Sequence, residues 1–196
     1  MFKAIILRIW NSKQTYTHTI ASGHAYGTIR EMAEAAGRKK LGLLGHSDHA
    51  PGIPGTAHPF HFCNFEAIPR NLYGVSIIHG SEVNVLNDGT LSLADRFIGG
   101  LDYLIAGIHM NCYWDEGRKK NTDNLISCMK HPKVFFISHP DSDDAPLDYE
   151  RLVLAAKEYH VALEVNNSSL EKPLSRPGCV RNYTQMLNLC IRHSVP

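Results

Sequence analysis

The chain has 196 residues, of which 43% are hydrophobic and 20% are charged, a balance typical of a globular domain with a real core. Its formal net charge of +1 excludes a global attraction to nucleic acid or to a membrane. The apolar run at residues 4–7 is far too short to span a bilayer, and no signal-peptide cleavage site follows it. We therefore expect a cytoplasmic protein with a single domain over residues 1–196, and homo-oligomerisation stays possible.

Apolar runs typical of strands alternate along the chain with amphipathic runs typical of helices. The expected strands cover residues 15–20, 41–44, 75–78, 103–108, 134–137 and 161–165. The expected helices cover residues 28–39, 121–130, 148–159 and 179–193. Parallel strands need crossover connections, and a helix is the usual crossover, so the alternation predicts an α/β fold with a mainly parallel sheet. Residues 1–14 form an atypical N-terminal segment with no clear role.

Cysteine and histidine need separate explanations. The five cysteines are widely spaced and include no C-x-x-C pair, which argues against a disulfide framework or a zinc ribbon and favours reduced, mostly buried thiols. The chain has 12 histidines, and histidine is the commonest metal ligand of proteins. Their placement along the chain therefore bears on function.

Histidine or glutamate follows nearly every expected strand. The candidate metal ligands are His18, His24, His49, Glu82, His109 and His139. Imidazole and carboxylate suit zinc, iron or manganese, and a bridging Glu82 could hold two ions close together. Two such ions can activate a water molecule and clamp a phosphoryl group. Strand ends converge on one face of a (β/α) barrel, so this pattern favours a barrel over an open doubly wound sheet.

Ordered motifs along residues 15–169 resemble those of the polymerase and histidinol phosphatase (PHP) family. The motifs are THTIASGHAYGT, HSDHAP, GSEVN, AGIH, ISHP and LEVNNSS, and they are most similar to those of the small stand-alone bacterial phosphatases. The resemblance implies a distorted (β/α)7 TIM-like barrel that holds up to three divalent ions, zinc first, with manganese or iron as alternatives. It also implies a phosphatase that hydrolyses small phosphate monoesters by a metal-bound hydroxide.

The resemblance assigns the same six residues as metal ligands, and His18, Glu82, His109 and His139 as the catalytic group. The ligand set Glu82, His109 and His139 is intact. The opening Asp-x-His-x-His motif of the family falls on Gln14, Tyr16 and His18, so its aspartate and its first histidine are replaced. A late Asp-x-His of the family has no counterpart before the chain ends. We therefore expect a C-terminally incomplete barrel that lacks its last strand and helix, with two half-built metal sites.

Two alternatives to an active phosphatase stay open. One is a truncated, catalytically impaired remnant that binds metal at a single site. The other is an amidohydrolase-like enzyme acting on C–N bonds, although Tyr16 interrupts the His-x-His expected on the first strand of that group.

Further polar residues could support the site or contact substrate. They are Asp48, His58, His61 and Asn166. Asp48 could fix the tautomer of a neighbouring histidine, and the two loop histidines could touch substrate from a barrel rim. Asn166 could bind phosphate or cap a strand end. Arg176 and Arg181 could contact an anionic substrate, but we interpret them as surface charges.

Overall fold

The computed structural model describes residues 13–195, so residues 1–12 of the predicted N-terminal segment lie outside the described residues. The described residues divide into two compact units, one of residues 13–83 with 93–104 and one of residues 84–92 with 105–195. The predicted α/β class, with parallel strands and intervening helices, is confirmed. Within residues 13–195, no helix is long and apolar enough to cross a membrane.

The first unit is built on a parallel sheet with one antiparallel edge. Its strands are β1 (Lys13–Gln14), β2 (Leu43–His49), β3 (Asn71–Leu72) and β4 (Val75–Asn84). β1, β2 and β4 run parallel in that order, and β3 pairs antiparallel with β4. β2 and β4 extend well beyond the predicted apolar runs, because their later, polar residues are buried too and keep the ladder paired.

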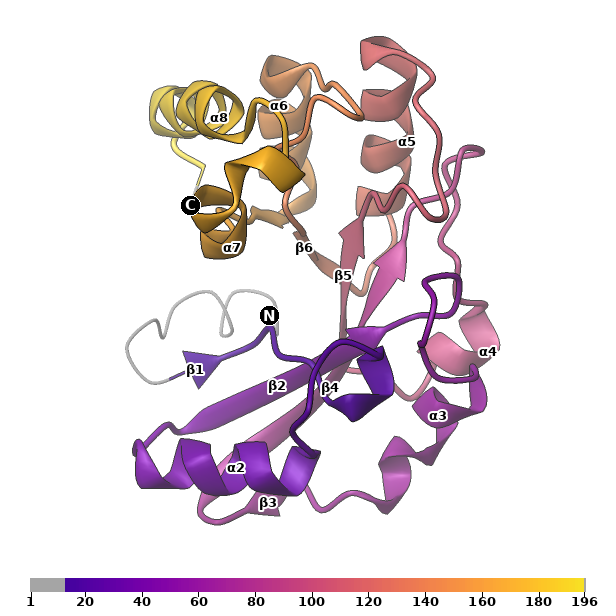
Figure 1. The fold of residues 1–196 in the computed structure, drawn as a ribbon, viewed down its shortest axis with the longest axis vertical. Helices are drawn as coiled ribbons and strands as arrows, with labels where there is room; N and C mark the ends of the chain where they lie inside the picture. The colour runs from indigo at the N-terminus through magenta and orange to yellow at the C-terminus, as the bar shows by residue number, and fades with distance from the viewer. Residues whose placement is uncertain (1–12, 196) are drawn as a thin grey trace. The chain divides into compact units, whose positions relative to one another are not determined.

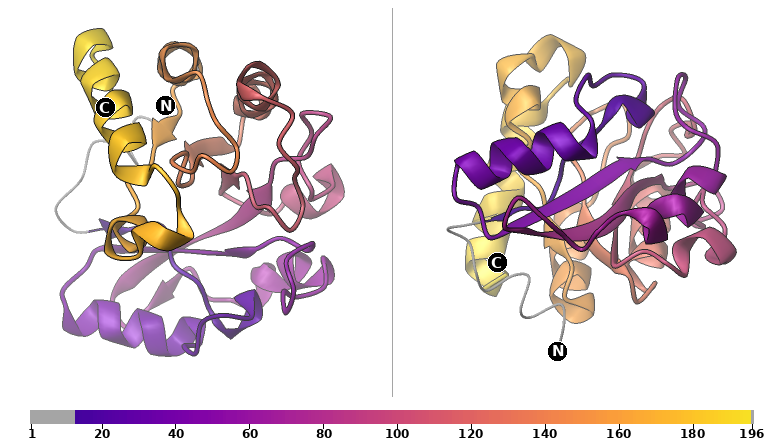
Figure 2. Two further views of the ribbon diagram at one scale, coloured as in Figure 1. Left: turned by 45° about the horizontal axis from the view of Figure 1, so that its top comes forward. Right: turned by 90° about the horizontal axis from the view of Figure 1, so that it is seen from below.

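Helix α2 (Ile29–Arg38) lies along β2 and β4 in both sets of views (Figures 1 and 2). It begins at a capping box, in which Thr28 and Glu31 satisfy each other's backbone N–H groups. Its buried residues Ala33 and Ala36 pack in one hydrophobic cluster with strand residues. The strand residues of this cluster are Leu44, Val75 and Ile77. The helix predicted over residues 28–39 is thereby confirmed.

Short elements complete the first unit, and the sequence predicts none of them. They are η2 (Ile20–Ser22), α3 (Phe60–Cys63), η3 (Asn64–Ala67) and α4 (Asp95–Ile98). The strand predicted over residues 15–20 is wrong. The Thr17 hydroxyl donates to the Gly45 carbonyl at 2.9 Å, while the Ser47 N–H donates to the Thr17 carbonyl at 2.8 Å. The Gly45 carbonyl would accept a backbone N–H in a regular β-ladder, but here it accepts the Thr17 hydroxyl.

The second unit places helices beside a short run of strands. Its strands are residues 105–107 of β5 (Tyr103–Gly107), then β6 (Val134–Ile137) and β7 (Ala162–Leu163), in the order β5-β6-β7. Its helices are α5 (Arg118–Met129), α6 (Tyr149–Tyr159), α7 (Asn167–Glu171), η4 (Pro173–Ser175) and α8 (Cys179–His193). α6 packs against both α5 and α8 (Figure 1). The three predicted helices of this region are confirmed.

Candidate metal centre

Three histidines of the first unit lie close together. One ligand atom from each of His18, His24 and His49 lies within 4.8 Å of the other two. His49 Nε2 is 2.9 Å from His24 Nε2, and the His18 ring stacks on the His49 ring with centroids 4.6 Å apart. Imidazole nitrogens gathered in this way fit the coordination sphere of one divalent ion such as zinc. The structure therefore brings three of the candidate ligands together.

Backbone geometry brings these histidines together. His49 ends β2, His18 follows β1, and His24 follows the η2 turn. That turn closes at Gly23, whose φ is 75°. A Cβ at Gly23 would lie 2.7 Å from the carbonyl oxygen of Gly55, so only glycine fits the turn.

Glu82 lies beside the histidines with its side chain fully buried. The register of β2 against β4 pairs His49 with Glu82, and this places Glu82 Oε2 3.1 Å from His49 Nδ1. The same oxygen is 3.4 Å from His18 Nε2. A carboxylate beside the second nitrogen of a metal-binding histidine is the usual device that orients the ring.

Asp48 organises the turn that carries these ligands. Its buried carboxylate accepts hydrogen bonds from Thr19 N at 2.6 Å, Thr19 Oγ1 at 2.8 Å, Ser22 Oγ at 2.7 Å and His61 Nε2 at 3.1 Å. Burial by itself raises the pKa of Asp48, but these hydrogen bonds outweigh it and hold the pKa below its usual range. Asp48 therefore holds the turn in place and is itself held by His61.

Ser22 links Asp48 to two of the histidines. Its hydroxyl accepts the His49 backbone N–H at 3.1 Å and lies 3.0 Å from His18 Nδ1. Because the single Ser22 proton is donated to Asp48, His18 Nδ1 must be the donor in this contact. The tautomer so fixed leaves the His18 Nε2 lone pair for a metal ion. Sequence reasoning missed Ser22, and its only signal was a hydroxyl in the turn before His24.

Two further histidines of the first unit are buried beside this network. His46 and His79 are fully buried, and both rings lie against Phe65, with centroids 4.4 and 5.2 Å away. Burial lowers the pKa of His46 to about 3 and that of His79 to about 4. Both rings are therefore neutral at physiological pH and form part of the core.

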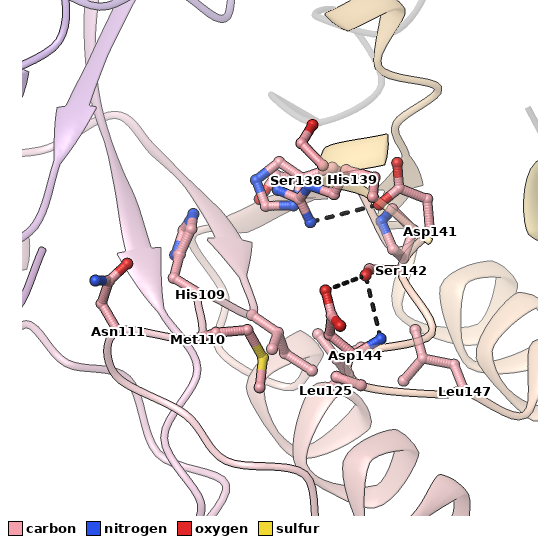
Figure 3. A pocket seen from close by; sticks show the side chains of 15 residues that line it. His109, Met110, Asn111, Leu125, Ser138, His139, Asp141, Ser142, Asp144 and Leu147 are labelled. Atoms are coloured by element: carbon pink, nitrogen blue, oxygen red, sulfur yellow. Dashed lines mark hydrogen bonds and ion pairs between the residues drawn. The ribbon is translucent and has the colours of Figure 1, made fainter. Parts of the chain in front are cut away.

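The second unit holds the other two predicted ligands. His109 follows β5 and His139 follows β6, with ring centroids 5.1 Å apart. His139 has a φ of 29°, a conformation that non-glycine residues adopt rarely and mainly at functional sites. Its N–H donates to Glu164 Oε2 at 2.7 Å, which helps to hold it there. Both histidines line a cavity of about 190 Å³ (Figure 3).

The remaining candidates lie in local contacts of their own. His58 is exposed, and its Nδ1 accepts the Phe60 N–H at 3.3 Å while the two rings stack. Asn166 is the N-cap of helix α7 and accepts the Ser168 N–H at 2.8 Å. All five cysteines are free thiols, and Cys128, Cys179 and Cys190 are buried.

The fold and the histidine group define an α/β protein with a candidate metal centre. The chain is 39% identical to a probable phosphatase of Clostridium novyi over 92% of its own length and 73% of that protein. It is 38% identical to a probable phosphatase of Syntrophotalea carbinolica, covering 92% and 75%, and 41% identical to one of Thermoanaerobacter sp. strain X514, covering 86% and 69%. No family model matches the chain. The chain belongs to the family of these probable phosphatases.

Proposed function

We propose that this protein is a metal-dependent phosphatase that hydrolyses small phosphate monoesters. The observation that carries the proposal is the His18, His24 and His49 group beside Glu82, in a chain whose relatives are named probable phosphatases. The PHP resemblance of the motifs supports the same chemistry. The same resemblance implies that the chain folds as a distorted (β/α)7 barrel. The parallel strands and intervening helices support this fold.

In this proposal His18, His24 and His49 hold one divalent ion, Glu82 adds a carboxylate ligand beside them, and Ser22 orients the His18 ring. His109 and His139 are the proposed ligands of the second unit. Zinc suits nitrogen-rich ligands best, and manganese or iron is the alternative. A divalent ion supplies positive charge that polarises the phosphoryl group and acidifies a water molecule.

The chain's own residues account for the rest of the site. Asp48 and Ser22 fix the His18 tautomer, so that its Nε2 atom stays unprotonated. The ligands are thereby arranged before any ion or substrate binds, which limits the reorganisation needed during reaction. The net charge of +1 gives no reason to expect nucleic acid as substrate.

The test loads the full chain separately with zinc, manganese and iron and measures release of 4-nitrophenol from 4-nitrophenyl phosphate. We expect turnover that a chelator abolishes and that added metal restores. The Glu82→Gln variant should bind metal more weakly, and turnover should fall with it. Metal-loaded protein that shows no phosphatase activity with any of the three ions would refute the proposal.

A metal-binding protein without turnover is the second candidate, because Gln14 and Tyr16 replace the aspartate and the first histidine of the family motif. The Gln14 amide donates to the Tyr16 carbonyl at 3.1 Å, and the Tyr16 ring lies 5.3 Å from the His18 ring. Metal analysis separates the candidates: one tightly held ion with no activity supports the second, whereas activity refutes it.

A further inference from the structure

The cavity of the second unit is a candidate binding site with a function of its own. Figure 3 shows residues that follow β5, among them His109, Met110 and Asn111, opposite residues of the loop that follows β6. The two histidines at its rim are the proposed metal ligands of this unit. A ligand in the cavity would therefore contact both these histidines and the loop after β6.

Arg176 is the only arginine or lysine among the described residues that line this cavity. Its Nη1 lies 3.4 Å from Oδ1 of Asp141, whose side chain is completely buried. The Arg176 side chain is itself 27% exposed. A guanidinium has five N–H donors, so one long contact leaves most of them available to an anion in the cavity.

The backbone around Arg176 is fixed to the loop after β6. Asn182 Nδ2 donates to the Asp141 carbonyl at 2.7 Å, and the Asp143 N–H donates to the Pro177 carbonyl at 2.8 Å. The Arg176 N–H donates to the Pro173 carbonyl at 3.3 Å. The arginine is thus held at the cavity before a ligand arrives, which lowers the entropic cost of binding.

A second donor faces the same space. Ser138 lines the cavity and is only 1% exposed, and its Oγ has no hydrogen-bond partner among residues 13–195. Leaving a buried hydroxyl unpaired costs free energy, so the arrangement favours a ligand that accepts its proton. The Asp144 carboxylate also lines the cavity, but it accepts the Ser142 hydroxyl at 2.8 Å.

We propose that this cavity binds the phosphoryl group of the substrate, with Arg176 and Ser138 donating hydrogen bonds to its non-bridging oxygens. The inference rests on the proposed phosphatase function and adds to it a specific binding site. Asp141 acts as a positioning residue that aims the guanidinium. Inorganic phosphate, which shares the phosphoryl chemistry, should occupy the same site.

The test measures the dissociation constant of inorganic phosphate for the manganese-loaded full chain by isothermal titration calorimetry. The Arg176→Ala variant should weaken binding by about 10- to 100-fold, the loss expected for hydrogen bonds to a charged group. Arg176→Lys should fall between this variant and the wild type, because lysine keeps the charge but loses the planar fork. Ser138→Ala should weaken binding by less than Arg176→Ala.

Arg181→Ala is the matched control. Arg181 pairs with Asp143 on the surface and does not line the cavity, so this variant should bind phosphate like the wild type. Because Arg176→Ala leaves the buried Asp141 carboxylate without its cation, the Arg176→Ala/Asp141→Asn double variant repeats the measurement with that charge removed. Thermal unfolding checks that each variant is folded.

The outcomes separate this inference from the proposed function. Wild-type protein that does not bind phosphate, or folded Arg176 variants that bind it within twofold of the wild type, would overturn the inference. If the wild type hydrolyses 4-nitrophenyl phosphate in that case, the proposed function still stands. If phosphate binds through Arg176 but no ester is hydrolysed, the binding site stands and the phosphatase proposal fails.

Discussion

The hydroxyl of Ser22 donates a hydrogen bond to the buried carboxylate of Asp48 at 2.7 Å. This bond determines the proton position on a different residue, because Ser22 can then only accept from His18 Nδ1. Ser22 thus fixes the tautomer of a proposed metal ligand.

Ser22→Ala should lower the affinity for zinc by about 10- to 100-fold, the usual cost of losing a partner that orients a ligand. The change removes the contacts of Ser22 with His18, His49 and Asp48 together. Competition with a chromogenic chelator measures the affinity. Ser76→Ala is the control, because Ser76 is exposed and lies on β4 six residues before Glu82. Equal zinc affinity in the two variants would contradict this role of Ser22.

His24→Ala should reduce zinc affinity more than Ser22→Ala does, because it removes a ligand atom and not a supporting contact. His58→Ala is the matched control, since His58 is also an exposed histidine of the first unit but lies in a local contact with Phe60. Zinc content after gel filtration, determined by mass spectrometry, gives the comparison. If both variants retain zinc like the wild type, His24 is not a ligand.

His46 and His79 should make the protein less stable in mild acid. Their folded pKa values of about 3 and about 4 lie below the unfolded value of 6.5, so the unfolded chain binds more protons as the pH falls below 6.5. At pH 5 each histidine should cost about 2 kcal/mol of unfolding free energy relative to pH 7 and above. The loss should continue until the pH passes the folded pKa values.

Urea denaturation of metal-free protein between pH 7 and pH 5 measures this effect. His46→Leu should show a clearly shallower decline in unfolding free energy, because one of the two buried rings is gone. His58→Leu, at an exposed position, should follow the wild type. A decline in His46→Leu as steep as that of the wild type would show that acid instability arises elsewhere.

Gly80→Ala should destabilise the first unit by about 1–3 kcal/mol, the cost of overpacking a filled core. A Cβ at residue 80 would lie 2.5 Å from Cζ of the buried Tyr103 ring. That ring carries a hydroxyl that donates to the Thr15 carbonyl at 2.7 Å, close to the segment that leads to His18. Gly100→Ala is the control, because no atom lies within 4 Å of a Cβ there. Equal midpoints in urea would contradict the prediction.

Much of the chain's architecture could be predicted from local pattern. The α/β class and the helices at residues 28–39, 148–159 and 179–193 follow from apolar periodicity and capping residues, which act within a few residues. β2 and β4 were predicted too short, because periodicity ends where the strands become polar. Their polar residues stay in the ladder since neighbouring elements bury them.

The sequence by itself determined which residue types could bind metal, because histidine and glutamate carry that chemistry wherever the fold places them. Only the tertiary structure decided their grouping. The register of β2 against β4 sets His49 beside Glu82, and the turn held by Asp48 brings His18 and His24 to the same point. The roles of Ser22 and Arg176 depend on partners 26 and 35 residues away in sequence, a separation that no local pattern records.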